Sequence, residues 1–256
     1  MANQVQTEQG IVRILDDSVL DGYNESIKSY NSERAREYLG KFSRSNGELT
    51  GSSPLMIIQL INAGLLPKET RLATREDLEY AVSRNNSFLR ENYTDFGLAL
   101  RSAGDSYQNN DLLAKRLASQ LEQRDINIGE GKLIPLDVLS LIDEKDLEYG
   151  VVIDLKEEAE KSIRDINDFK WNYARNEGLS RADLYGYRGW DSLDVHLAGS
   201  YGGGRVVVVS DEGTTKNFQP DNLMQKIQSA LNRRKAFEYQ GTLYVPVSDT
   251  RIKINK

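Results

Sequence analysis

The residues best placed to do chemistry follow a short apolar run late in the chain. Residues 206–209 are four valines, which predict a central strand buried on both faces, and residues 220–234 have helical spacing. The polar segment 210–216 lies between them. In open α/β sheets ligands gather where a strand ends and a helix begins, so this segment is the first candidate site.

The side chains of that segment suit a hard cation and an anion. Asp211 and Glu212 could hold a divalent cation such as Mg²⁺, and Thr214, Thr215 and Lys216 could meet a phosphate or a carboxylate. This set would suit a metal-assisted hydrolase or transferase acting on a phosphate-bearing substrate. The Gly-Lys-Ser/Thr of a phosphate-binding P-loop is missing, and a polar connection without a ligand is the alternative.

A second candidate is the segment 181–190, in which aromatic and basic residues alternate. Tyr185, Tyr187, Arg188 and Trp190 could stack against a base, a sugar or the side chains of a partner. Tyrosine is also common in half-buried strands, so ordinary packing is the alternative. We interpret these four residues as a candidate ligand-binding surface.

His196 is the one histidine of the chain, and a general base would need a nucleophile and an orienting carboxylate. Asp194 and Ser200 are close in sequence, but the Gly-x-Ser-x-Gly of a nucleophile elbow is missing. The glycine-rich run 199–204 lies between two predicted strands, whereas phosphate loops precede a helix. We therefore predict an exposed histidine and a hairpin connection, and assign no catalytic residue.

The acid-x-lysine pair Asp154 and Lys156 follows a short apolar run, as in some metal-dependent nucleases. Asp137, Asp143 or Asp146 could supply a second carboxylate. Such a pair also arises often by chance, and Lys156 begins a strongly charged segment. A solvent-exposed face is the alternative interpretation.

Composition excludes several classes of site. The 256 residues contain no cysteine and one histidine, so disulfides, thiolate nucleophiles, iron–sulfur ligation and multi-histidine metal centres are excluded. We predict no cofactor, with a hard cation such as Mg²⁺ as the exception. The net charge is −6, from 15 basic and 18 acidic residues up to position 128 and 18 and 21 beyond it. Because neither half is basic, we do not expect a nucleic-acid partner.

A helix-turn-helix is not predicted either. The helices expected at 54–62 and 74–84 are joined by eleven residues, 63–73, where about three or four are needed. The second of these helices has more acidic than basic residues, which does not suit a groove-facing element.

Periodicity predicts an α+β protein in which a mainly helical region, 1–128, precedes an α+β region with a mixed sheet, 129–256. Helices are expected at 31–42, 54–62, 74–84, 89–100, 111–124, 156–173 and 220–234. Strands are expected at 151–155, 193–197, 206–209, 236–240, 242–247 and 251–254.

The chain begins without a signal-peptide pattern and has no run of about 18 apolar residues, so we expect a soluble, cytoplasmic protein without a membrane contact. Our working hypothesis is a non-catalytic interaction or ligand-binding protein with a protein or small-molecule partner. The metal-assisted hydrolase or transferase is the alternative.

Overall fold

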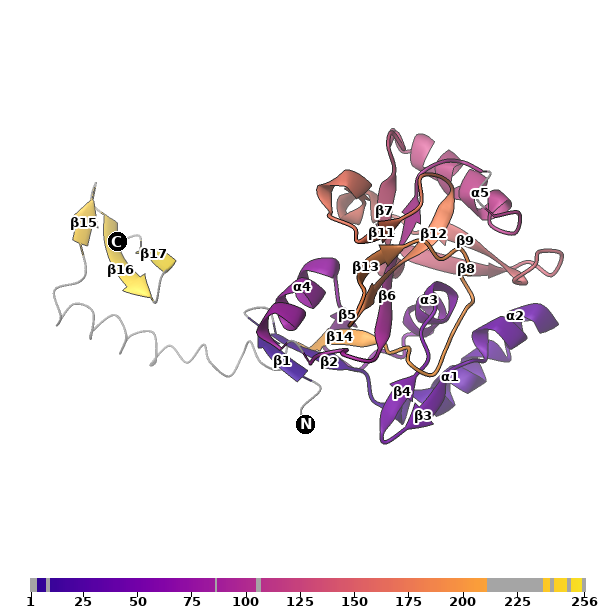
Figure 1. Cartoon of the computed structure of the whole chain (residues 1–256), viewed down its shortest axis with the longest axis horizontal. Coiled ribbons are helices and arrows are strands. Elements are labelled where there is room, and N and C mark those ends of the chain that lie inside the picture. Colours follow the sequence, from indigo (N-terminus) through magenta and orange to yellow (C-terminus); the bar gives the residue numbers. More distant parts are fainter. Residues whose placement is uncertain are drawn as a thin grey trace. The chain divides into compact units, whose positions relative to one another are not determined.

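The computed structural model describes residues 4–7, 10–85, 87–104 and 107–210, and the backbone of three strands within 237–254 (Figure 1). The residues of 4–7 and 11–210 belong to one compact unit, and the three late strands belong to another. These strands, β15 (Phe237–Tyr239), β16 (Thr242–Val247) and β17 (Thr250–Ile254), form an antiparallel sheet in chain order, and they confirm the three strands predicted in this segment. The predicted helix 220–234 lies outside the described residues.

A six-stranded mixed sheet forms the centre of the larger unit, in the order β10-β7-β6-β12-β13-β11. All neighbours are antiparallel except β11 and β13, which are parallel. Its strands are β6 (Tyr93–Leu100), β7 (Lys132–Pro135), β10 (Arg164–Asp165), β11 (Tyr173–Ala174), β12 (Leu179–Tyr185) and β13 (Gly189–Ser192). Strands from both sides of residue 128 therefore share this sheet.

A four-stranded sheet has the order β1-β2-β14-β5. It contains β1 (Gln4–Thr7), β2 (Gly10–Ile14), β5 (Thr70–Leu72) and β14 (Val207–Ser210). The valines of β14 are buried, and the strand pairs with β2 on one side and β5 on the other, which confirms the predicted central strand. Two hairpins, β3 (Ser43–Ser45) with β4 (Glu48–Thr50) and β8 (Leu139–Asp143) with β9 (Val151–Leu155), complete the strands.

The α-helices of the described residues lie before residue 123 and are interspersed with strands β3 to β6. They are α1 (Leu20–Ile27), α2 (Glu33–Leu39), α3 (Pro54–Asn62), α4 (Arg75–Arg84) and α5 (Asp111–Glu122). Hydroxyls of Ser32, Ser53 and Thr74 accept hydrogen bonds from backbone N–H groups in the first turns of α2, α3 and α4. No helix in this part of the chain combines the length and apolar character needed to cross a membrane.

The two faces of the six-stranded sheet are covered by different layers (Figure 1). On one face, Leu98 and Leu179 belong to the core that includes α3, α5 and the β8–β9 hairpin. On the other face, Phe96 and Ala182 pack in a second core with α4 and the four-stranded sheet. Burial on both faces explains why β6 is buried along its whole length.

The helix predicted at 89–100 is wrong, because this segment contains the central strand β6. Leu89, Tyr93, Phe96 and Leu100 recur at helical spacing. Every residue of β6 is buried, so its sequence lacks the alternation of apolar and polar residues that indicates a strand with one exposed face. A β-bulge between Ala182 and the next residue of β12 also shifts the register on β6.

Two predictions in the second half are also wrong. The segment 156–173 forms short 3₁₀ turns, η3 (Ala159–Ser162) and η4 (Ile166–Asp168), with β10 between them, and Glu158 adopts a left-handed conformation that stops an α-helix. The segment 193–197 is a loop. The Arg181 N–H of β12 bonds the Asp194 carbonyl, but the next carbonyl, that of Val195, accepts from the side-chain amide of Asn110, so no ladder of strand hydrogen bonds forms.

Candidate functional site

The first predicted site cannot be placed, because Asp211, Glu212, Thr214, Thr215 and Lys216 lie outside the described residues. The metal hypothesis for this loop therefore stays a prediction. Among the residues that the structure describes, no group of three or more acidic or histidine side chains is arranged to hold a metal ion.

Three of the four residues of the second candidate lie together. Tyr185 contacts Tyr187 edge-on, with ring centroids 5.8 Å apart, and Arg188 lies 5.3 Å from the Tyr185 ring centroid and 4.9 Å from that of Tyr173. We call Tyr173, Tyr185, Tyr187 and Arg188 the tyrosine surface. Tyr187 is 70% exposed, and Arg188 forms an ion pair with the buried Asp191 at 3.3 Å. The tyrosine surface is thus exposed, and its Arg188 is held in position by a buried carboxylate.

The fourth residue, Trp190, lies on the other face of the sheet. Its ring is perpendicular to that of Phe96, and the guanidinium of Arg75 lies 4.2 Å from its ring centroid. Trp190 therefore packs in the second core and does not extend the tyrosine surface.

A buried polar cluster lies behind the tyrosine surface. Arg181, which is fully buried, donates from Nε and Nη2 to the two carboxylate oxygens of Asp95, both at 2.6 Å. Ser52 Oγ donates to Asp95 Oδ2 at 2.5 Å, and Arg181 Nη1 donates to the Gly199 carbonyl at 2.8 Å. Two loops distant in sequence are thereby fixed to strands β6 and β12.

Three aspartates stand opposite one another on adjacent strands of this cluster. Asp183 of β12 is the register partner of Asp95 on β6 and of Asp191 on β13, and all three are buried. Burial, and then the nearby charge of Asp95, raises the pKa of Asp183 well above its usual range. Asp183 Oδ1 has no hydrogen-bond partner in the structure. Asp183 therefore holds a proton more readily than an ordinary aspartate.

The remaining predicted residues are engaged in structural contacts. His196 is exposed and donates its backbone N–H to Asp194, while Ser200 Oγ accepts from the backbone of Ser52, so the three form no catalytic relay. Asp154 accepts hydrogen bonds from Arg116 and Gln120 of α5.

Asp143, one of the acids considered as a partner of Asp154, lies apart from it. Asp143 accepts from the backbone N–H groups of Asn31 and Ser32 at the start of α2, at the opposite end of the β8–β9 hairpin. Lys156 Nζ donates to the carbonyl of Asp137. These contacts give no support to the nuclease interpretation.

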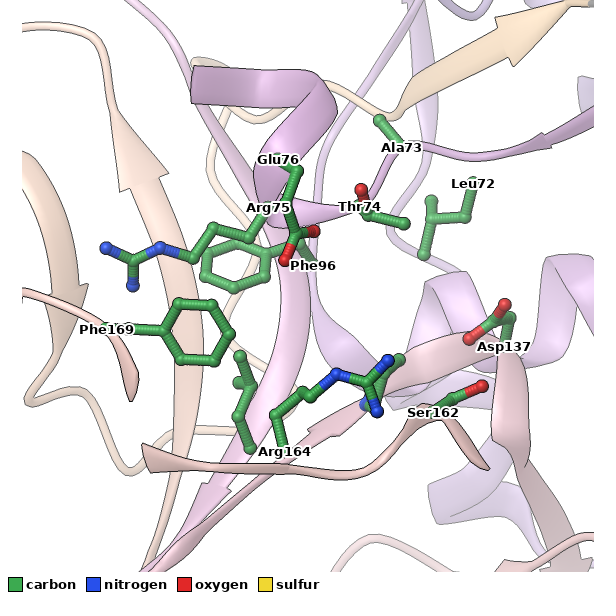
Figure 2. A pocket seen from close by; sticks show the side chains of 12 residues that line it. Leu72, Ala73, Thr74, Arg75, Glu76, Phe96, Asp137, Ser162, Arg164 and Phe169 are labelled. Atoms are coloured by element: carbon green, nitrogen blue, oxygen red, sulfur yellow. The ribbon is translucent and has the colours of Figure 1, made fainter. Parts of the chain in front are cut away.

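A cavity of about 160 Å³ lies between the first turn of α4 and strand β7, and we call it the α4–β7 cavity (Figure 2). Its floor is apolar and buried, and includes Leu72, Phe96 and Leu133. Its volume matches that of an engineered cavity, about 150 Å³, that holds benzene. An apolar group of that size therefore fits the floor.

Exposed charged side chains form the rim of this cavity. Asp137, Ser162 and Arg164 lie together on one side, while Thr74 and Glu76 project from the start of α4 (Figure 2). Arg164 donates to two neighbouring backbone carbonyls and has no ion pair within the described residues. The rim can therefore offer both a cation and carboxylates to a ligand.

Arg75 lines this cavity and also contacts aromatic rings packed against the second core. Its guanidinium lies 4.2 to 4.8 Å from the ring centroids of Phe169, Trp171 and Trp190 and donates to the Lys170 carbonyl at 2.6 Å. Burial lowers the pKa of Arg75. Of these three rings, that of Phe169 lines the cavity, so Arg75 helps to hold this part of the cavity wall in place.

The cavity and the polar cluster were not predicted from the sequence. The residues of the cavity come from segments up to about 100 positions apart, so no spacing rule joins them. A signal for the polar cluster did exist: Asp95, Arg181 and Asp183 are charged residues within segments that are otherwise mostly apolar.

Comparisons of the chain with protein-family models, with curated proteins and with solved structures gave no match.

Proposed function

We propose that this protein is a non-catalytic binding protein that holds a small zwitterionic molecule in the α4–β7 cavity. The observation that carries the proposal is the cavity itself, which combines a buried apolar floor with an exposed rim of both charge signs. Ligand sites commonly have this composition, with a few polar groups that orient an apolar body.

The charges of the rim define the class of ligand. Arg164 could bind a carboxylate, and Glu76 and Asp137 could bind an ammonium group. The volume of about 160 Å³ admits one apolar group of benzene size. An apolar α-amino acid is the simplest molecule with these three parts.

The test is a thermal-shift and calorimetric titration with L-leucine and L-phenylalanine. A ligand at one hundred times its dissociation constant adds about 2.7 kcal/mol of stability, which for a protein of this size raises the Tm by roughly 5–10 °C. N-acetyl and amide derivatives should bind more weakly, because each lacks one of the two charges.

The matched variants are Arg164→Gln and Arg34→Gln. Arg34 is an exposed arginine on α2 and does not line the cavity. R164Q should weaken binding at least tenfold and R34Q should leave it unchanged. The proposal fails if neither amino acid binds, or if R164Q binds as tightly as the unmodified chain.

A second candidate function is stacking of a planar or sugar ring on the tyrosine surface, favoured by the 70% exposure of Tyr187 beside Arg188. Saturation-transfer NMR with monosaccharides and nucleosides tests it. Tyr187→Ala should abolish the transfer, whereas Leu112→Ala, a control at another exposed apolar residue, should not. Equal transfer to both variants would exclude the tyrosine surface.

A further inference from the structure

A separate cleft of about 260 Å³ lies beside the ends of β6 and β11. We call it the Arg101 cleft. Its polar lining consists of Arg101, Arg175, Asn167, Asn176 and Glu130, and Trp171 forms an aromatic wall. None of these residues lines the α4–β7 cavity, so the inference does not depend on the proposed function.

Arg101 is an arginine without a matching carboxylate. Its Nη2 donates to Ser192 Oγ at 2.7 Å, but its Nη1 is buried and has no hydrogen-bond partner. The ion pairs of the described residues do not include Arg101, although guanidinium groups in partly buried positions usually meet an acid. An N–H donor is therefore left over at this position.

A second cation lies close to it. Arg175 lines the same cleft, and its backbone N–H donates to the Ser192 carbonyl at 3.3 Å. Burial, and then the positive charge of Arg175, lowers the pKa of Arg101 to about 10. Two like charges that face one cleft repel each other, and an anion between them would relieve the repulsion.

The one acid of the cleft is already engaged. Glu130 is exposed and accepts a hydrogen bond from the side-chain amide of Asn167. The lining therefore has two cations and one carboxylate, and its formal charge is positive. Trp171 is fixed by a hydrogen bond from its Nε1 to the Ile166 carbonyl at 3.1 Å.

We propose that the Arg101 cleft binds the oxyanion group of a small ligand, a carboxylate or a phosphate, between Arg101 and Arg175. A guanidinium presents several N–H donors in a plane, which matches the oxygens of both groups. The face of Trp171 would then cover the ligand's body.

The experiment uses the full chain and tryptophan fluorescence. The sequence contains two tryptophans, so Trp190→Phe leaves Trp171, in the wall of the cleft, as the one reporter. Sodium phosphate and sodium citrate are titrated separately at constant ionic strength, with sodium chloride as the reference. Saturable changes with phosphate, with citrate or with both support an oxyanion site and identify which group it prefers.

The variants decide whether Arg101 and Arg175 hold the anion. Arg101→Gln and Arg175→Gln should each weaken binding at least tenfold in the W190F background, and Arg34→Gln should change it less than twofold. R175Q alters a partly exposed residue and provides the test if R101Q does not fold. The proposal is overturned if both salts give only the chloride response, or if the folded glutamine variants bind as the parent does.

Discussion

Asp95→Asn should be the most informative single substitution in this protein. The Asp95 carboxylate accepts two hydrogen bonds from Arg181 at 2.6 Å and one from Ser52 at 2.5 Å, and both members of the ion pair are fully shielded from solvent. Removing one member of a buried pair costs about 3–5 kcal/mol, because the other charge is left without its partner. Two further acids within 3.4 Å of Arg181 still attract its charge, so we expect about 3 kcal/mol.

For a domain of about 200 residues, that loss lowers the Tm by roughly 6–12 °C. Thermal unfolding followed by circular dichroism, with urea unfolding as a second measurement, tests this. The matched control is Asp154→Asn, which removes a partly exposed ion pair to Arg116. Because solvent screens such pairs, the control should cost less than about 1 kcal/mol.

The reasoning is refuted if D95N costs no more than D154N. The double variant Asp95→Leu with Arg181→Met adds a second check. It removes both charges of the pair, and replacing a buried pair by apolar side chains is often neutral or stabilising. The double variant should therefore be more stable than Asp95→Leu alone.

Three further outcomes follow from other contacts. Burial raises the native pKa of Asp183 above the usual 3.8, so the contribution of its protonated form to stability is complete below pH 3.8 and is lost as pH rises through the native pKa. The unmodified chain should therefore gain stability relative to Asp183→Asn when the pH falls from 7 to about 4, and parallel curves of unfolding free energy against pH would contradict this. Thr74→Ala removes the capping box of α4 and should cost about 1 kcal/mol in urea unfolding, and no loss would contradict the cap. Gly186→Ala places a Cβ 1.7 Å from the Leu89 carbonyl oxygen and should lower the Tm by several degrees. The control is Gly202→Ala, whose Cβ has no atom within 4 Å, and equal Tm values for the two variants would refute the predicted clash.

The helices with local start signals could be predicted from the sequence. Residues 54–62 and 75–84 form α3 and α4 as the serine and threonine caps indicate, and the apolar composition of α3 agrees with the burial of its residues 54–60. In these elements the deciding contacts lie within four residues of each other. The α+β class follows from them together with the valines of β14.

Other elements depend on contacts that the local sequence does not contain. β6 is a strand because β7 and β12 pair with it from both sides, and those strands lie more than 30 and 70 residues further along the chain. The tyrosine surface could be predicted in part, since Tyr185, Tyr187 and Arg188 are near neighbours in sequence. Trp190 departs from it because the pleat of β13 and the second core place its ring on the other face of the sheet.

The buried cluster around Arg181 also bears on the tyrosine surface. An apolar core would stabilise the sheet at least as well, so stability alone does not explain a buried arginine between aspartates. Its hydrogen bonds instead fix the positions of neighbouring groups, including Ser52. The hydroxyl of Tyr93 donates to the Ser52 carbonyl and accepts from the backbone N–H of Tyr201, and the Tyr93 ring stacks on that of Tyr185. A network that holds Ser52 therefore also holds the ring beneath the tyrosine surface. Through this coupling, D95N should broaden the NMR signals of the Tyr185 and Tyr187 rings under conditions where the variant is fully folded, and D154N should leave them sharp.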